Sequence, residues 1–223
     1  LIHGEELKSN SVYELDVENF SNNENVSDEI ISYPNSENPE QNMAKKIAKV
    51  PTVEEWQNAK NLQDLREAIQ GCKKCSLWKT RTNFVFGEGN PKAKLVVIGE
   101  APGADEDEQG KPFVGRAGKL LTEILKAVDF TREEVFICNI LKSRPPNNRN
   151  PLPEEIEACE PYLFKQLELI KPKLILCVGT FAAQTLLRSK EPLGKMRGKF
   201  HEYQGIPTMV TFHPAALLRN PNW

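Results

Sequence analysis

A short apolar run, LVVIG at residues 95–99, constrains the fold of this chain more than any other feature. It is rich in β-branched residues and has no polar position, which is typical of a strand buried on both faces of a parallel sheet. The run stops at Glu100, and Gly99, Pro102 and Gly103 predict a tight turn directly after it. Open α/β sheets bind their ligands at the carboxyl ends of strands, so this turn predicts a site.

Strand-like and helix-like segments alternate along the rest of the sequence. We expect further strands at residues 134–141, 174–179 and 208–212. We expect helices at 51–70, capped by Thr52 with Glu55, at 119–128 with an opening turn from Gly115, at 153–170 and at 181–187. The alternation predicts a three-layer α/β/α sandwich on a mostly parallel, four-stranded sheet.

Charge divides the sequence into two parts. Residues 1–50 hold ten acidic and four basic side chains, a net charge of −6; the whole chain carries −2, so the remainder carries +4. The first part is rich in Asn, Ser and Glu and has little periodicity, which predicts a disordered acidic segment over residues 1–50 and one folded domain over 51–223. A modestly basic domain is compatible with a nucleic-acid partner.

The sequence predicts an intracellular, cytoplasmic protein that does not interact with membranes. No apolar run is long enough to span a membrane, and the first ten residues have no signal-peptide core. Five cysteines, an odd number, favour metal ligands or buried thiols over a disulfide framework. The start at Leu1 and the end at Trp223, soon after a motif, leave open that the chain is a fragment.

Three polar residues fall at or just after the ends of predicted strands: Glu100, Asn139 and His213. Taken singly, such residues are more often caps, turn formers or half-buried side chains. Together they lie on one rim of the predicted sheet, and convergent polar groups at a strand-end crevice favour a binding site.

Several motifs now point to a known family. The segments GEAPGADEDEQGKPFVGRAG, NILKSRPPNNRNPLPEE, GCKKC and FHPAALLRNP together resemble the family 4 uracil-DNA glycosylases, which carry an iron–sulfur cluster. The resemblance covers the chain from Leu65 to its end. It implies a monofunctional, monomeric repair enzyme that flips uracil out of single- or double-stranded DNA, hydrolyses its N-glycosidic bond and leaves an abasic site for downstream repair enzymes. The alternative is a non-catalytic DNA-binding or scaffold relative.

The resemblance assigns a role to four side chains. It implies that Phe113 stacks on the uracil face and that Asn139 pairs with the uracil edge. His213 matches the residue that donates a hydrogen bond to uracil O2 as negative charge develops there. Glu100 matches the position that activates water or stabilises the cationic sugar.

The turn after the first strand is expected to complete the base pocket through Gly99, Ala101 and Gly103. In better-known uracil-DNA glycosylases, a tyrosine at the place of Gly103 screens out the methyl group of thymine. Three acidic residues that follow are candidates for that task here: Asp105, Glu106 and Asp107.

Two segments beside the pocket, 144–151 and 213–221, are expected to grip DNA. Their arginines suit phosphate groups, and their leucines suit a wedge that fills the gap left by a flipped base. The candidates are Arg144, Arg149 and Arg219 for phosphates, and Leu217 and Leu218 for the wedge.

The resemblance also implies a 4Fe–4S cluster held by Cys72, Cys75, position 143 and Cys159. Position 143 is Ser143, and a hydroxyl is a poor substitute for a thiolate. Three outcomes follow: a cluster with serine or solvent as its fourth ligand, a cluster that lacks one iron, or recruitment of Cys138.

Recruitment of Cys138 is the least expected outcome, because this residue directly precedes Asn139 and its movement would disturb base reading. Cys177 lies within a predicted strand and is expected in the core. We therefore predict a structural cluster whose fourth position is incomplete or labile.

Overall fold

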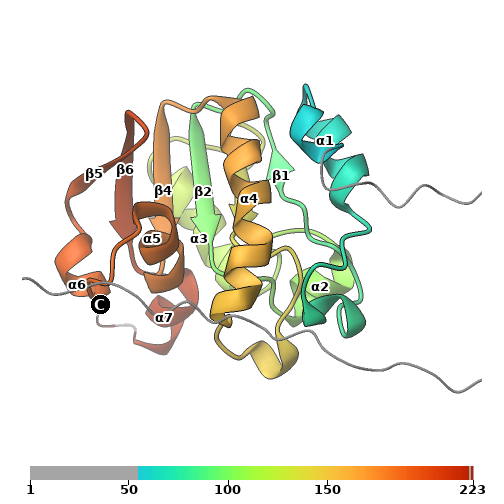
Figure 1. The fold of residues 1–223 in the computed structure, drawn as a ribbon. Coiled ribbons are helices and arrows are strands. Elements are labelled where there is room, and N and C mark those ends of the chain that lie inside the picture. The colour runs from blue at the N-terminus through green and yellow to red at the C-terminus, as the bar shows by residue number, and fades with distance from the viewer. Residues whose placement is uncertain (1–54, 221, 223) are drawn as a thin grey trace, which may run out of the picture. The chain divides into compact units, whose positions relative to one another are not determined.

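A six-stranded sheet in the order β1-β3-β2-β4-β6-β5 forms the centre of the described part of the chain (Figure 1). The structure is a computed structural model that describes residues 55–220 and 222. The four central strands, β3, β2, β4 and β6, run parallel to one another. The strands are β1 (Glu88–Gly89), β2 (Leu95–Gly99), β3 (Phe136–Asn139), β4 (Leu174–Val178), β5 (Phe200–Tyr203) and β6 (Ile206–Thr211).

The predicted mostly parallel sheet is confirmed, but the predicted number of four strands is wrong. The two additional strands, β1 and β5, are antiparallel and lie at the two edges. Neither has an apolar run: β1 has only two residues, and β5 alternates exposed and half-buried positions with Phe200 largely exposed. Pairing with a neighbouring strand, which the sequence pattern does not reveal, creates both of them.

Helices cover both faces of the sheet and confirm the three-layer sandwich. In Figure 1, α4 (Pro153–Ile170) and α5 (Thr180–Leu187) lie in front of the sheet, and α3 (Arg116–Lys126) lies behind it. The residues of α4 and α5 belong to one buried apolar cluster, and Leu121 and Leu125 of α3 belong to another. The α4 boundaries match the prediction, because Pro153 stands at its first position and Lys171 ends it in a left-handed conformation.

Within residues 55–70, the predicted helix is two shorter pieces, η1 (Trp56–Asn58) and α1 (Leu62–Ile69). Asn61 caps α1, and its side-chain oxygen accepts a hydrogen bond from the Asp64 amide at 2.9 Å. The predicted cap, Thr52, lies outside the described residues, as do the boundary after residue 50 and the predicted disorder before it. The remaining helices are η2 (Ser76–Lys79), α2 (Ala104–Gln109), η3 (Pro146–Asn148), α6 (Leu193–Met196) and α7 (Pro214–Arg219).

Strand register places the ends of the central strands at one rim. Gly99 of β2 pairs with Asn139 of β3, and Val178 of β4 pairs with Thr211 of β6. Chain segments that leave these strands therefore enter the same crevice. None of the helices that the structure describes has the length and apolar character needed to cross a membrane.

We predict that α4 contributes strongly to stability through its buried face. Leu163 is fully buried, so Leu163→Ala should lower the free energy of unfolding by about 2–5 kcal/mol. Val128→Ala, at a 59% exposed position, is the matched control and should change little. Urea denaturation measures both, and equal effects would contradict the packing described here.

Candidate functional site

A cavity of about 730 Å³ opens at the carboxyl ends of the central strands. It is lined by residues of the turn after β2, of the end of β3 and of the segment after β6. Six of the seven residues predicted for the base pocket line it: Glu100, Ala101, Gly103, Phe113, Asn139 and His213. The seventh, Gly99, is not among the lining residues. Distant sequence segments thus meet as predicted.

Gly99 allows two of these side chains to approach the backbone closely. A Cβ atom at this position would overlap both Oδ1 of Asn139 and the ring of Phe113. Oδ1 of Asn139 is buried and, within the described part of the chain, has no hydrogen-bond partner. Because an unpaired buried acceptor is costly, a ligand donor in the cavity is its natural partner.

Phe113 is held in a backbone conformation that bulky residues rarely adopt, with φ = 51°. The Arg132 guanidinium donates hydrogen bonds to the carbonyl oxygens of Phe113 and Pro112, at 3.0 and 2.8 Å. The Phe113 ring stacks against the His213 imidazole, with 5.5 Å between ring centroids and 29° between planes. Arg132 thus fixes the loop that carries Phe113, a buried residue that lines the cavity. No motif in the sequence marks Arg132.

Glu106 fixes the other side of the same loop. Its carboxylate accepts hydrogen bonds from the backbone amides of Val114 and Gly115, both at 2.9 Å, and of Gly103, at 3.1 Å. The carboxylate also lines the cavity. Among the three acidic candidates for thymine exclusion, Glu106 is the one placed at the cavity.

Asp107 has a different task. It is buried, and its carboxylate accepts hydrogen bonds from the backbone amides of Thr82 and Asn83 at 3.0 and 3.3 Å. It therefore anchors the segment before β1 to α2 and does not line the cavity. Asp105 is exposed and likewise outside the cavity lining.

His213 is held as a neutral imidazole of defined tautomer. Burial lowers its pKa to about 4; the nearby positive charge of Arg219 acts in the same direction, and Glu106 opposes it. The backbone amide of Ala215 donates to Nδ1 at 3.1 Å. Since Nδ1 is an acceptor, the neutral ring carries its proton on Nε2, which is then a donor.

Glu100 is a half-buried carboxyl group at the rim. Burial raises its pKa above the ordinary value of 4.5. None of the ion pairs formed by residues 55–220 involves it. Its backbone is fixed, because its carbonyl oxygen accepts a hydrogen bond from the Leu141 amide at 3.0 Å. Glu100 lines the cavity, and a carboxyl group there is suited to act on water or on developing positive charge.

The segments predicted to grip DNA are only partly at the cavity. Arg149 and Arg219 line it, whereas Arg144 and the two leucines, Leu217 and Leu218, do not. Leu218 is 40% exposed and Leu217 is half-buried. Their predicted roles at DNA therefore remain predictions.

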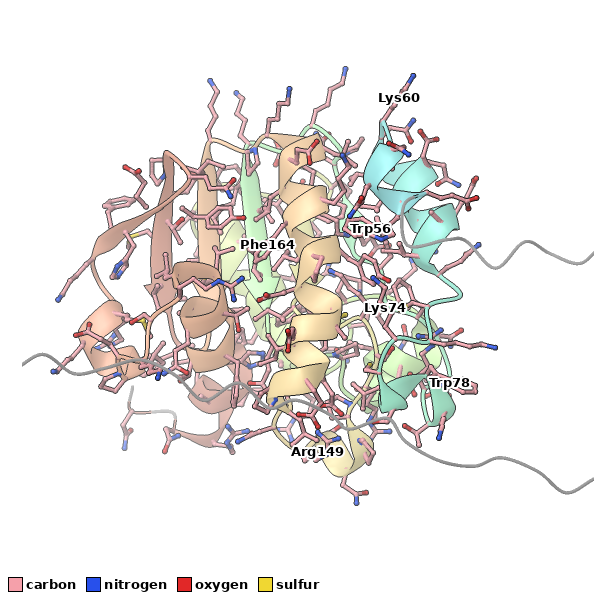
Figure 2. All side chains as sticks on the ribbon, in the orientation of Figure 1. Trp56, Lys60, Lys74, Trp78, Arg149 and Phe164 are labelled. Atoms are coloured by element: carbon pink, nitrogen blue, oxygen red, sulfur yellow. The ribbon has the colours of Figure 1, made fainter. Side chains whose placement is uncertain are left out.

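Arg149, labelled near the start of α4 in Figure 2, is already engaged within the protein. Its guanidinium donates two hydrogen bonds to the buried Glu155 carboxylate, at 2.9 and 2.6 Å. This contact lowers the pKa of Glu155. Arg144 in turn donates from Nε to Oδ1 of Asn148 at 2.8 Å. The loop that carries both arginines is thus braced internally.

The five cysteines form two groups. Burial raises the pKa of Cys159 to about 12, and the nearby thiols of Cys72 and Cys75 raise it as well. Cys177, by contrast, has Cys138 as its neighbouring thiol, and both are buried within the sheet. Cys72, Cys75 and Cys159 thus lie near enough to one another to interact electrostatically, and Cys177 lies in the core as expected.

Hydrogen bonds hold the first group in place. Cys72 accepts from the Tyr162 hydroxyl at 3.2 Å, and Cys159 accepts from the Lys142 amide at 3.2 Å. Lys74 lies over the Tyr162 ring and over the Trp56 ring; Lys74 and Trp56 are labelled in Figure 2. These contacts pin the GCKKC loop against α4.

Ser143 is buried, and its hydroxyl accepts a hydrogen bond from the Arg81 guanidinium at 3.1 Å. Burial raises the pKa of the Cys75 thiol, and the nearby positive charge of Arg81 opposes that shift without reversing it. Three cysteine sulfurs and one serine hydroxyl are thus the groups that could hold a cluster here. No group of three or more His, Cys, Asp or Glu side chains among the described residues is drawn in tightly enough for a single metal ion.

We predict that His213 stays neutral down to an unusually low pH. Its imidazole signals in a ¹H–¹⁵N NMR titration should have a midpoint near pH 4, and the His213→Ala spectrum assigns them. Because an exposed histidine takes up its proton near 6.5, the contribution of His213 to stability should be lost as the pH falls from 6.5 towards 4. A midpoint near 6.5 would contradict the buried environment.

Comparison with known proteins agrees with this site. The sequence matches the uracil DNA glycosylase superfamily over residues 86–223. It is 48% identical to proteins of Archaeoglobus fulgidus and Pyrobaculum aerophilum and 45% identical to one of Thermotoga maritima, each named a type-4 uracil-DNA glycosylase. These alignments cover 72%, 72% and 71% of this chain and 85%, 86% and 84% of the relatives. The chain belongs to the uracil DNA glycosylase superfamily and, within it, to the type-4 uracil-DNA glycosylases.

Proposed function

We propose that this protein excises uracil from DNA by hydrolysing the N-glycosidic bond, which leaves an abasic site as the substrate of other repair enzymes. The observation that supports this most strongly is the unpaired, buried Oδ1 of Asn139, in one cavity with the Phe113 ring and a neutral His213. One chain supplies all of these groups, which is consistent with a monomer. The target base must be flipped out of the helix to reach them.

Base recognition follows from the donors and acceptors of one amide. Asn139 can donate to uracil O4 and accept from uracil N3–H, which supplies the partner that its Oδ1 lacks. Cytosine presents the opposite pattern and would leave buried polar groups unpaired, so it is rejected. Phe113 contributes a stacking surface whose position Arg132 and Glu106 fix from both sides.

Bond cleavage places negative charge on the departing uracil and positive charge on the sugar. The Nε2–H group of His213 donates to uracil O2 and stabilises the leaving anion; a neutral donor suits this role because it needs no proton transfer. Glu100, as a carboxylate, stabilises the sugar cation and orients the attacking water.

A second candidate function is a DNA-binding relative without activity, which the altered residue Ser143 alone would favour. The two readings are separated with a labelled oligonucleotide that contains one uracil, followed by alkaline cleavage of abasic sites. The proposed function requires a strand break that depends on uracil. Binding without such a break would support the non-catalytic reading.

We predict that His213→Ala and Asn139→Ala damage catalysis far more than DNA binding. Loss of a donor to the leaving anion should reduce the rate of uracil release by about 10²–10³. Affinity for the same DNA, measured by fluorescence anisotropy, should change little. His201→Ala is the matched control, since His201 contacts the Met196 carbonyl away from the cavity. Equal losses of rate and affinity would contradict the assigned roles.

We also propose that Cys72, Cys75 and Cys159 hold an iron–sulfur cluster with Ser143 at its fourth position. When bound, the cluster supplies a rigid crosslink between the GCKKC loop and α4; hydrolysis itself needs no redox step. The convergence of these three thiols supports the proposal, as do the N–H and O–H groups that donate to their sulfurs.

The expected result is iron and visible absorbance in anaerobically purified protein. Ser143→Cys should retain more iron on exposure to air, because a thiolate is the better ligand. Ser76→Cys, which adds a thiol at an exposed position of the same region, should not. Protein without iron or visible absorbance would rule out the cluster and leave the glycosylase proposal standing.

A further inference from the structure

Lys142 is a fully buried lysine three residues after the base-reading Asn139, and the proposed mechanism gives it no task. Among the ion pairs of the described residues, none involves it. A buried ammonium group without a carboxylate partner is costly, and an apolar side chain would fill the space more cheaply. Its contacts show what its terminal nitrogen binds.

The ammonium group bridges β3 and α4. It donates to the main-chain carbonyl oxygen of Asn139 at 2.7 Å and to Oε1 of Gln166 at 2.6 Å. Gln166 is also fully buried, and its Nε2 donates to the carbonyl oxygen of Phe86 at 2.9 Å. Lys142 and Gln166 thus form one connected relay from the end of β3 to the segment that precedes β1.

Lys142 and Gln166 lie beside the end of β3, on the side where this strand has no neighbouring strand to pair with among the described residues. The antiparallel strand β1 pairs with Phe136 and Ile137 of β3 but does not reach Asn139. On the other side, the Gly99 carbonyl oxygen accepts from the Ile140 amide at 3.0 Å. The Asn139 peptide is therefore held by β2 on one side and by the Lys142 ammonium on the other.

We propose that Lys142 is a positioning residue of the uracil pocket, which clamps the main chain of Asn139 so that its amide meets the uracil edge in the reactive alignment. Lys142 does not line the cavity and acts only through Asn139. Because the direction of the Asn139 side chain follows from its backbone, release of the clamp loosens the amide without removing it. The inference rests on the proposed function.

The test is a double-mutant cycle in the full chain. Lys142→Met keeps the length of the side chain and removes the donor. In single-turnover assays on uracil-containing DNA it should slow uracil release by about 10- to 100-fold, as expected for a small misplacement of a contact group. DNA affinity should stay within about twofold, since no DNA contact is lost. The double variant with Asn139→Ala should be no slower than Asn139→Ala alone.

A purely structural role predicts a different pattern. The Lys142→Met effect would then multiply with that of Asn139→Ala, and this outcome would overturn the inference. Thr208→Val is the matched control: Thr208 is equally buried in β6, where its hydroxyl donates to the Ile206 carbonyl oxygen, and the variant should leave the rate unchanged.

Two further outcomes are a variant that does not fold and a wild-type protein without activity. If Lys142→Met does not fold, Gln166→Met, which removes the acceptor that orients the ammonium, goes through the same cycle and must show the same non-additivity. If the wild-type protein releases no uracil, the proposed function fails and the inference falls with it. If the wild-type protein is active and the effects of the two substitutions multiply, the inference about Lys142 fails but the proposed function stands.

Discussion

The pairing of Gly99 with Asn139 across β2 and β3 is the constraint on which the site depends. It sets the amide of Asn139 over a residue without a side chain, in space that any Cβ atom would occupy. Phe113 enters the same space from its loop. A shift of one residue in this register would turn Asn139 to the other face of the sheet and remove its amide from the pocket.

Burial shifts the pKa values of the two candidate catalytic groups in opposite directions, and both shifts favour the neutral form of the side chain. It lowers the pKa of His213 and raises that of Glu100, since desolvation disfavours charge in both. For His213 the result is a fixed Nε2–H donor, because the Ala215 amide occupies Nδ1. For Glu100 the result is a carboxyl group that binds protons more readily than an exposed glutamate does.

The cysteine group and the pocket are neighbours through one residue. The Lys142 amide donates to Cys159, while its ammonium donates to the Asn139 carbonyl. Two residues, Asn139 at the end of β3 and Lys142 three positions later, thus connect Cys159 of α4 to the uracil pocket. Through this contact, a rigid cluster region would support the end of β3 and thereby the pocket.

The sequence by itself determined the parallel core, the α4 boundaries and the convergence of Glu100, Asn139 and His213, because apolar runs and strand ends are local features that parallel pairing brings to one rim. It did not reveal the edge strands β1 and β5, the engagement of Arg149 by Glu155, or the roles of Arg132 and Lys142. Only the tertiary structure decided these, since each depends on a partner that is distant in sequence or on a buried hydrogen bond that no periodicity encodes.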